Sequence, residues 1–78
     1  MDIKLKIGQR IRAVRETKNM AQKDLAYAAD LDRTYIASVE CGKRNISIVN
    51  IEKISNALGV SLKELFEDES FRVMGDAE

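Results

Sequence analysis

The stretch from Gln22 to Cys41, QKDLAYAADLDRTYIASVEC, predicts two short helices joined by a tight turn. Small and apolar residues recur in it at the spacing of one buried helix face. They are Leu25, Ala26, Ala29, Ile36 and Val39. Asp30 tolerates the left-handed backbone that a tight turn needs, and Asp32 is a good N-cap for the second helix. Packed at a steep angle, such a pair lets its second helix enter a major groove, so this stretch, residues 22–41, predicts a helix-turn-helix.

Two longer helices are expected on either side of this pair. The first runs from about Ile3 to Lys18, and the second runs from residue 48 to residue 58 behind the N-cap Ser47. Gly42, between the two regions, suits the left-handed residue that follows a helix C-terminus. The expected core faces are Ile7, Ile11 and Val14 in the first helix, and Ile48, Ile51, Ile54, Ser55 and Leu58 in the second.

A last helix is expected from Leu62 to about Glu67. Ser61 and Glu64 form a capping box at its start, with Val60 placed to pack back on the helix. The five segments predict an all-α fold, a compact five-helix bundle in a single domain spanning residues 1–78.

The composition argues against catalytic and metal-binding functions. The chain has 78 residues, no His and one Cys, so neither a disulfide nor a zinc site is expected. No nucleophile with a paired base and no Gly-rich phosphate loop is present, so we expect no enzyme activity and no cofactor. Because no apolar segment suggests a secretory signal or a membrane span, we expect a cytoplasmic protein without a membrane partner.

The charges are unevenly distributed although the formal net charge is zero. Residues 1–50 contain ten basic and six acidic side chains, a net charge of +4, while residues 51–78 contain three basic and seven acidic ones, a net charge of −4. Ordinary solvated charge would explain part of this pattern. The asymmetry also suits a protein that presents one face to a polyanion.

Several motifs resemble the Cro/CI–Xre helix-turn-helix family, whose fold is the lambda-repressor-like DNA-binding domain. The matching motifs are Gln22-Lys23-Asp24-Leu25-Ala26, Leu31-Asp32-Arg33-Thr34-Tyr35-Ile36, Glu40, Gly42 and Leu58-Gly59-Val60-Ser61-Leu62-Lys63-Glu64-Leu65-Phe66. The resemblance covers about residues 5–67. Within the family, Asp32–Ile36 combined with Lys43–Ser47 is most similar to the controller proteins of bacterial restriction-modification systems.

This resemblance implies a sequence-specific transcriptional regulator. It implies a homodimer that binds a palindromic operator upstream of its own gene and an endonuclease gene. It also implies a dual role, as an activator that contacts RNA polymerase and as a repressor. A prophage-type repressor and an antitoxin-type autorepressor share much of the pattern. A helical protein-interaction module without DNA binding is the alternative from another class.

Three departures from the family pattern stand out. Ala21 occupies the position where Ser or Thr usually caps the first helix of the pair, so we expect that cap to be lost. Asp30 replaces the usual turn Gly. Ala37 and Cys41 replace Ser and a basic residue, which weakens the expected phosphate contacts at the edge of the recognition helix.

The candidate DNA-binding residues lie on the recognition helix and around it. Arg33 can donate two hydrogen bonds to guanine, and Thr34 can contact a thymine methyl group or cap its own helix. Tyr35 is expected to face outward, with packing on the preceding helix as the alternative, and Ser38 shares the face of Thr34. Gln22 suits a phosphate contact at a helix N-terminus. The set is completed by the loop residues Lys43, Arg44 and Asn45 and, as a weaker phosphate candidate, Arg15.

Glu40 would repel phosphate, so we expect it to bind Arg15 or Arg12 within the protein instead.

A dimerisation region is expected at about residues 46–72. One such domain contacts few base pairs, so specificity calls for two copies on a palindrome. The region has more apolar residues than one small core needs, and the alternative is that they close the monomer core. The candidate interface residues are Ile46, Ile48, Val49, Leu62, Leu65 and Phe66.

Overall fold

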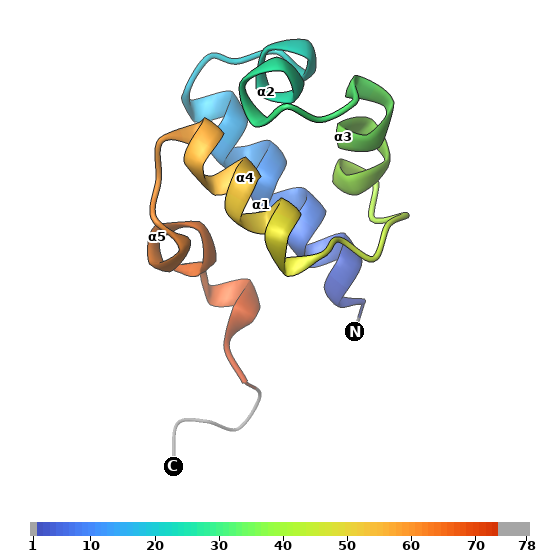
Figure 1. Ribbon diagram of the computed structural model, residues 1–78. Helices are drawn as coiled ribbons and strands as arrows, with labels where there is room; N and C mark the ends of the chain where they lie inside the picture. The colour runs from blue at the N-terminus through green and yellow to red at the C-terminus, as the bar shows by residue number, and fades with distance from the viewer. Residues whose placement is uncertain (1, 74–78) are drawn as a thin grey trace.

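The computed structural model describes residues 2–73, and this part of the chain contains helices and no strand (Figure 1). The elements are α1 (Ile3–Thr17), α2 (Gln22–Ala29), α3 (Arg33–Glu40), α4 (Ile48–Leu58), α5 (Leu62–Phe66) and the 3₁₀ helix η1 (Glu69–Phe71). The predicted helix bounds agree with these to within one residue, and the all-α five-helix fold is confirmed; η1 was not predicted. Residue 1 and residues 74–78 of the predicted 1–78 domain lie outside the described residues.

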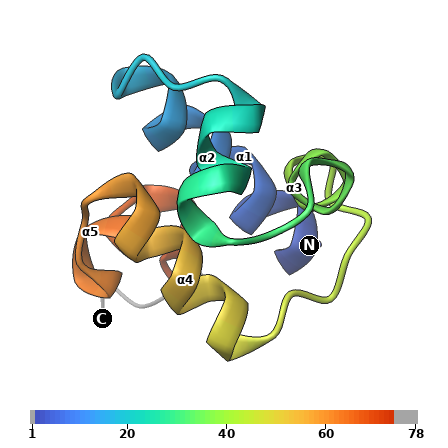
Figure 2. The same cartoon turned by 45° about the horizontal axis from the view of Figure 1, so that its top comes forward.

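The predicted helix-turn-helix, formed by α2 and α3, lies on a different side of the bundle from α5 (Figures 1 and 2). Helix α3 packs against α1 and α2, whereas α5 packs against α1 and α4. Helix α1 is therefore shared by the two regions. None of the helices within residues 2–73 has the length and apolar character needed to cross a lipid bilayer.

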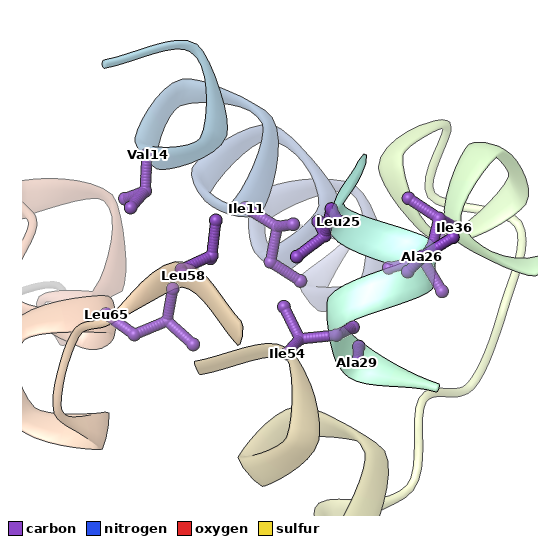
Figure 3. Close-up of a cluster of buried hydrophobic side chains, with 10 residues drawn as sticks. Ile11, Val14, Leu25, Ala26, Ala29, Ile36, Ile54, Leu58 and Leu65 are labelled. Atoms are coloured by element: carbon purple, nitrogen blue, oxygen red, sulfur yellow. The ribbon is translucent and has the colours of Figure 1, made fainter. Parts of the chain in front are cut away.

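Each of the five helices contributes a fully buried side chain to one core. These residues are Ile11, Leu25, Ile36, Ile54 and Leu65, each at most 1% exposed. Figure 3 shows those from α1, α2 and α4 pointing toward one another. Full burial of a side chain of this size stabilises the fold by about 1.5–3 kcal/mol. The core faces predicted for α2 and α3 are confirmed, since all five of their residues are buried.

The predicted core face of α4 is wrong at one position, Ile48. Its exposure is 81%, while Ile51 is half-buried and Ile54 is completely buried. The apolar stripe of α4 therefore runs past the core at the N-terminal end of the helix. Ile48 is left as exposed apolar surface.

A residue with left-handed backbone conformation follows each of the helices α2 and α3, as predicted. Asp30 has φ 57° after α2, and Gly42 has φ 76° after α3. Gly42 is also required by space, because a Cβ atom there would lie 2.8 Å from the Cα of Leu5. These two positions direct the chain into and out of α3.

The predicted side-chain caps form at three helix starts. Asp32 Oδ1 accepts the N–H of Thr34 at 3.0 Å, and Ser47 Oγ accepts that of Asn50 at 3.1 Å. At α5 the box is complete: Ser61 Oγ accepts the Glu64 N–H and Glu64 Oε1 accepts the Ser61 N–H. This backbone N–H of Ser61 lowers the pKa of the Glu64 carboxyl.

Helices α1 and α3 approach each other closely at Gly8. A Cβ atom at this position would overlap the carbonyl oxygen of Val39 and lie 2.9 Å from that of Glu40. Both neighbours are backbone atoms of α3, so a side chain is accommodated only if α3 shifts.

We predict that Gly8→Ala lowers the free energy of unfolding by about 1–3 kcal/mol, the usual cost of overpacking a tight contact. Urea denaturation of the two proteins measures the difference. A glycine inside a helix is normally less stable than alanine, so a stabilised Gly8→Ala protein would contradict this close approach.

The cap of α2 is half formed. Ala21 has no side-chain oxygen, yet its N–H donates to Asp24 Oδ2 at 3.0 Å. Its backbone (φ −78°, ψ 162°) already has the extended conformation of an N-cap residue.

We therefore predict that Ala21→Ser raises the free energy of unfolding by about 0.5–2 kcal/mol, because the hydroxyl would accept the N–H of residue 24. Thermal and urea unfolding measure this change. The same gain from Ala28→Ser, at an exposed position in the last turn of α2, would show that the effect is not capping.

Candidate nucleic-acid interface

A buried ion pair holds α3 against α1. Arg15 donates from Nε to Glu40 Oε2 at 2.8 Å and from Nη2 to Oε1 at 3.0 Å. Its Nη1 donates to the Met20 carbonyl oxygen at 2.7 Å. Both residues are less than 10% exposed, and the hydrogen bond to Glu40 raises the pKa of Arg15. The pair joins α1, the α1–α2 connection and the end of α3.

This geometry corrects the phosphate role predicted for Arg15. Its guanidinium is buried and used by Glu40 and Met20, so it does not belong to the DNA-facing surface. The predicted local anchoring of Glu40 is confirmed, and its partner is Arg15. Arg12, the other partner considered, pairs instead with Glu16 at 3.2 Å on the surface.

Gln22 is tied to the same carboxylate. Its Nε2 donates to Glu40 Oε1 at 3.0 Å, so the amide group of Gln22 is engaged in a hydrogen bond within the protein. The first N–H groups of a helix have no acceptor within it, and Gln22 and Lys23 occupy those positions in α2. The phosphate contact predicted for Gln22 therefore rests on backbone N–H groups more than on its amide.

Arg33 and Thr34 form the exposed first turn of α3. Within residues 2–73, neither side chain makes a hydrogen bond or an ion pair. Asp32 caps the helix by accepting the backbone N–H of Thr34, so the hydroxyl group of Thr34 remains available. The two side chains are placed on a rigid helix start and stay available to an external partner.

Tyr35 is less exposed than predicted. It is half-buried and packs against the core, and its hydroxyl accepts a hydrogen bond from Asn50 Nδ2 at 3.1 Å. The expectation of an outward side chain is therefore only partly met, because Asn50 of α4 draws the hydroxyl toward that helix. Asn50 was missed, since no local pattern relates residues 35 and 50.

The loop after α3 is held against the recognition helix by Arg44. Its guanidinium lies 5.3 Å from the centre of the Tyr35 ring, and its Nε donates to Ser38 Oγ at 3.3 Å. The Ser38 hydroxyl in turn donates to the carbonyl oxygen of Thr34, one turn earlier in α3, at 2.8 Å. Ser38 thus supports the loop within the protein, whereas the neighbouring Lys43 and Asn45 are exposed.

The predicted dimer residues divide into three groups. Ile48, Val49 and Leu62 are 81%, 60% and 42% exposed, and Ile46 and Phe66 are half-buried against the core. Leu65 is 1% exposed, so its predicted interface role is corrected to a core role. Its position four residues after Ser61, opposite Val60 across the cap, was the signal for burial.

Comparison with known proteins identifies the family of this chain. Residues 11–65 match the family model described as helix-turn-helix. The chain is 49% identical to the control protein C.BamHI of Bacillus amyloliquefaciens, over 99% of this chain and 93% of that protein.

Solved structures agree with this similarity. The restriction-modification controller protein C.AhdI from Aeromonas hydrophila matches with a TM-score of 0.78 at 46% identity, covering 81% of this chain and 96% of that one. The controller protein C.Esp1396I, solved as a tetramer in complex with its natural 35 base-pair operator, matches with a TM-score of 0.82 at 40% identity. That match covers 86% of this chain and 88% of the other.

We predict that Arg15→Met lowers the free energy of unfolding by about 3–5 kcal/mol, because it leaves the buried Glu40 carboxylate without its cation. Urea denaturation gives the value. Arg12→Met is the matched control and should change stability by less than about 1 kcal/mol, as expected for an exposed pair. Equal effects of the two substitutions would contradict the role of the buried pair.

Proposed function

This chain belongs to the helix-turn-helix family of the Cro/CI–Xre type, and from that membership we propose that it is a transcriptional regulator of a restriction-modification system. It binds a palindromic DNA operator as a homodimer and controls its own gene and that of the endonuclease. Its similarity along nearly the whole chain to C.BamHI supports this role over a prophage repressor or an antitoxin.

The observation that carries the proposal is the availability of Arg33 and Thr34 at the first turn of α3. This is the part of a recognition helix that reaches base edges in the major groove. Arg33 suits a guanine, to which it can donate two hydrogen bonds, and Thr34 suits a thymine methyl group or a phosphate. Because α3 is held by Arg15 and Glu40, both side chains are offered in one defined geometry.

The groups around this turn suit the DNA backbone. Lys43 and Asn45 are exposed in the loop, and Arg44 lies beside them on the Tyr35 ring. At the other end of the motif, the N-terminus of α2 offers N–H groups at Gln22 to a phosphate. Such contacts fix the register of the protein on the duplex while Arg33 and Thr34 specify the sequence. The net charge of +4 over residues 1–50 favours approach to the duplex.

Two copies of the chain pair through the apolar surface formed by Ile46, Ile48, Val49, Leu62 and Phe66, which we call the pairing surface. Two-fold symmetry places one recognition helix on each half-site, about one helical turn apart. The assembly of C.Esp1396I on its operator supports an oligomeric form.

The regulatory part of the proposal concerns gene control in the cytoplasm, where the chromosomal DNA lies. At low occupancy one dimer activates transcription by contacting RNA polymerase. When a second dimer fills a weaker neighbouring site, transcription is repressed. A footprint without any protected palindrome near the gene of this chain would overturn this part.

Selection of random duplexes by the purified protein, followed by sequencing, is expected to return symmetric half-sites. Against the selected operator, Arg33→Ala should lose about 1–3 kcal/mol of binding free energy and relax the preference at one base position of each half-site. Arg44→Ala should weaken binding too, with a smaller dependence of affinity on salt if its contact is to phosphate.

Arg12→Ala is the matched control, because Arg12 is an exposed arginine on α1 whose only bond within residues 2–73 is to Glu16. If Arg33→Ala and Arg44→Ala bound every tested duplex as tightly as Arg12→Ala does, the chain would be a protein-interaction module instead.

A further inference from the structure

Arg10 of α1 forms hydrogen bonds with the C-terminal end of α5. Its Nε donates to the Leu65 carbonyl oxygen at 2.7 Å, and its Nη2 donates to the carbonyl oxygens of Glu64 at 2.9 Å and Glu67 at 3.3 Å. Its Nη1 lies 3.8 Å from Asp68 Oδ1. The side chain is 22% exposed. One guanidinium from α1 therefore contacts four oxygen atoms of residues 64–68 while it is largely shielded from solvent.

Two of these three carbonyl groups need an external donor. The Leu65 and Glu67 oxygens receive no backbone N–H in the part of the chain that the structure describes. The end of a helix also carries partial negative charge, which a cation stabilises. Lys cannot replace Arg here, because the planar guanidinium presents several donors at once and the ammonium group is a single charged point.

Helix α5 depends on such outside contacts. It has five residues, a length at which a helix is not stable by itself. Its capping box fixes the N-terminal end, and the burial of Leu65 fixes one face. Arg10 is the contact that fixes the C-terminal end, where Phe66 leaves the helix and packs edge-to-face on Phe71 at 5.2 Å between ring centres.

Helix α5 carries two residues of the pairing surface, Leu62 and Phe66, four positions apart. Leu62 is 42% exposed, and Phe66 is half-buried at the edge of the core. A change in the orientation of α5 would therefore move these side chains relative to Ile48 and Val49 of α4. Helix α1 holds α3 through Arg15 and α5 through Arg10, so one helix relates the recognition helix to the pairing surface.

We propose that Arg10 is a positioning residue for self-association: by binding the C-terminal carbonyl groups of α5, it holds Leu62 and Phe66 in the arrangement that two copies require. This inference rests on the homodimer of the proposed function and assigns Arg10 no contact with DNA or with the partner copy. It acts through α5.

Sedimentation equilibrium of full-length Arg10→Lys tests the proposal. Lysine keeps the charge and the aliphatic chain but loses most of the hydrogen bonds, so the dimer dissociation constant is expected to rise about tenfold or more. Arg12→Lys is the matched control on the same helix and should leave the constant at the wild-type value. Ile36→Val, a core change remote from α5, controls for a general loss of stability and should also leave it unchanged.

Binding to DNA separates this role from a general structural one. Arg10→Lys should bind a duplex with one half-site as the wild-type chain does, at concentrations where both are monomeric, and lose affinity for the full palindrome. If Arg10→Lys is unfolded at the assay temperature, both measurements are made with Ala21→Ser added to all variants.

Two results overturn the proposal in distinguishable ways. A wild-type chain that stays monomeric at every concentration removes the homodimer of the proposed function together with this inference. A wild-type dimer whose dissociation constant is shared by Arg10→Lys and Arg12→Lys removes the role of Arg10 alone.

Discussion

The close contact between α1 and α3 is the constraint on which the recognition surface depends. Gly8 lets the two backbones approach, and the ion pair of Arg15 with Glu40 fixes their relative position. Taking two charges out of water is costly, so a buried pair of this kind contributes orientation more than net stability. The cost is limited here because no buried side-chain nitrogen or oxygen among the described residues lacks a hydrogen-bond partner. A recognition helix of eight residues is too short to be stable alone, so its direction is set by such tertiary contacts together with the burial of Ile36 and Val39.

Helix α1 carries two arginines with different tasks at its two neighbours. Arg15 binds a carboxylate at the end of α3, and Arg10 binds backbone carbonyl groups at the end of α5. Neither contact is local in sequence, since 25 residues separate the first pair and 55 the second. The two short helices that bear the proposed functions are thus both oriented by the longest helix of the bundle, and its packing relates DNA reading to subunit pairing.

Local chemistry predicted the fold well because helix starts, ends and buried faces are local features. Asp32, Ser47 and Ser61 act as caps, and Asp30 and Gly42 take left-handed conformations, as expected. The site was predicted less completely. The direction of a long side chain depends on what packs beside it, which is why Arg15 turned inward and Asn50 met Tyr35. An apolar surplus likewise does not say which residue is buried, so Leu65 and Ile48 were misplaced in opposite senses.

The isolation of Arg33 and Thr34 from the rest of the molecule has an evolutionary consequence. Within the described residues their side chains are exposed and make no hydrogen bond. Changes at these two positions are therefore free of a folding penalty, apart from differences in helix propensity of a few tenths of a kcal/mol. Such a protein can therefore change its target sequence through intermediates of equal stability, whereas changes at Gly8 or Glu40 carry a folding penalty. Divergence of binding specificity is thus uncoupled from divergence of the fold.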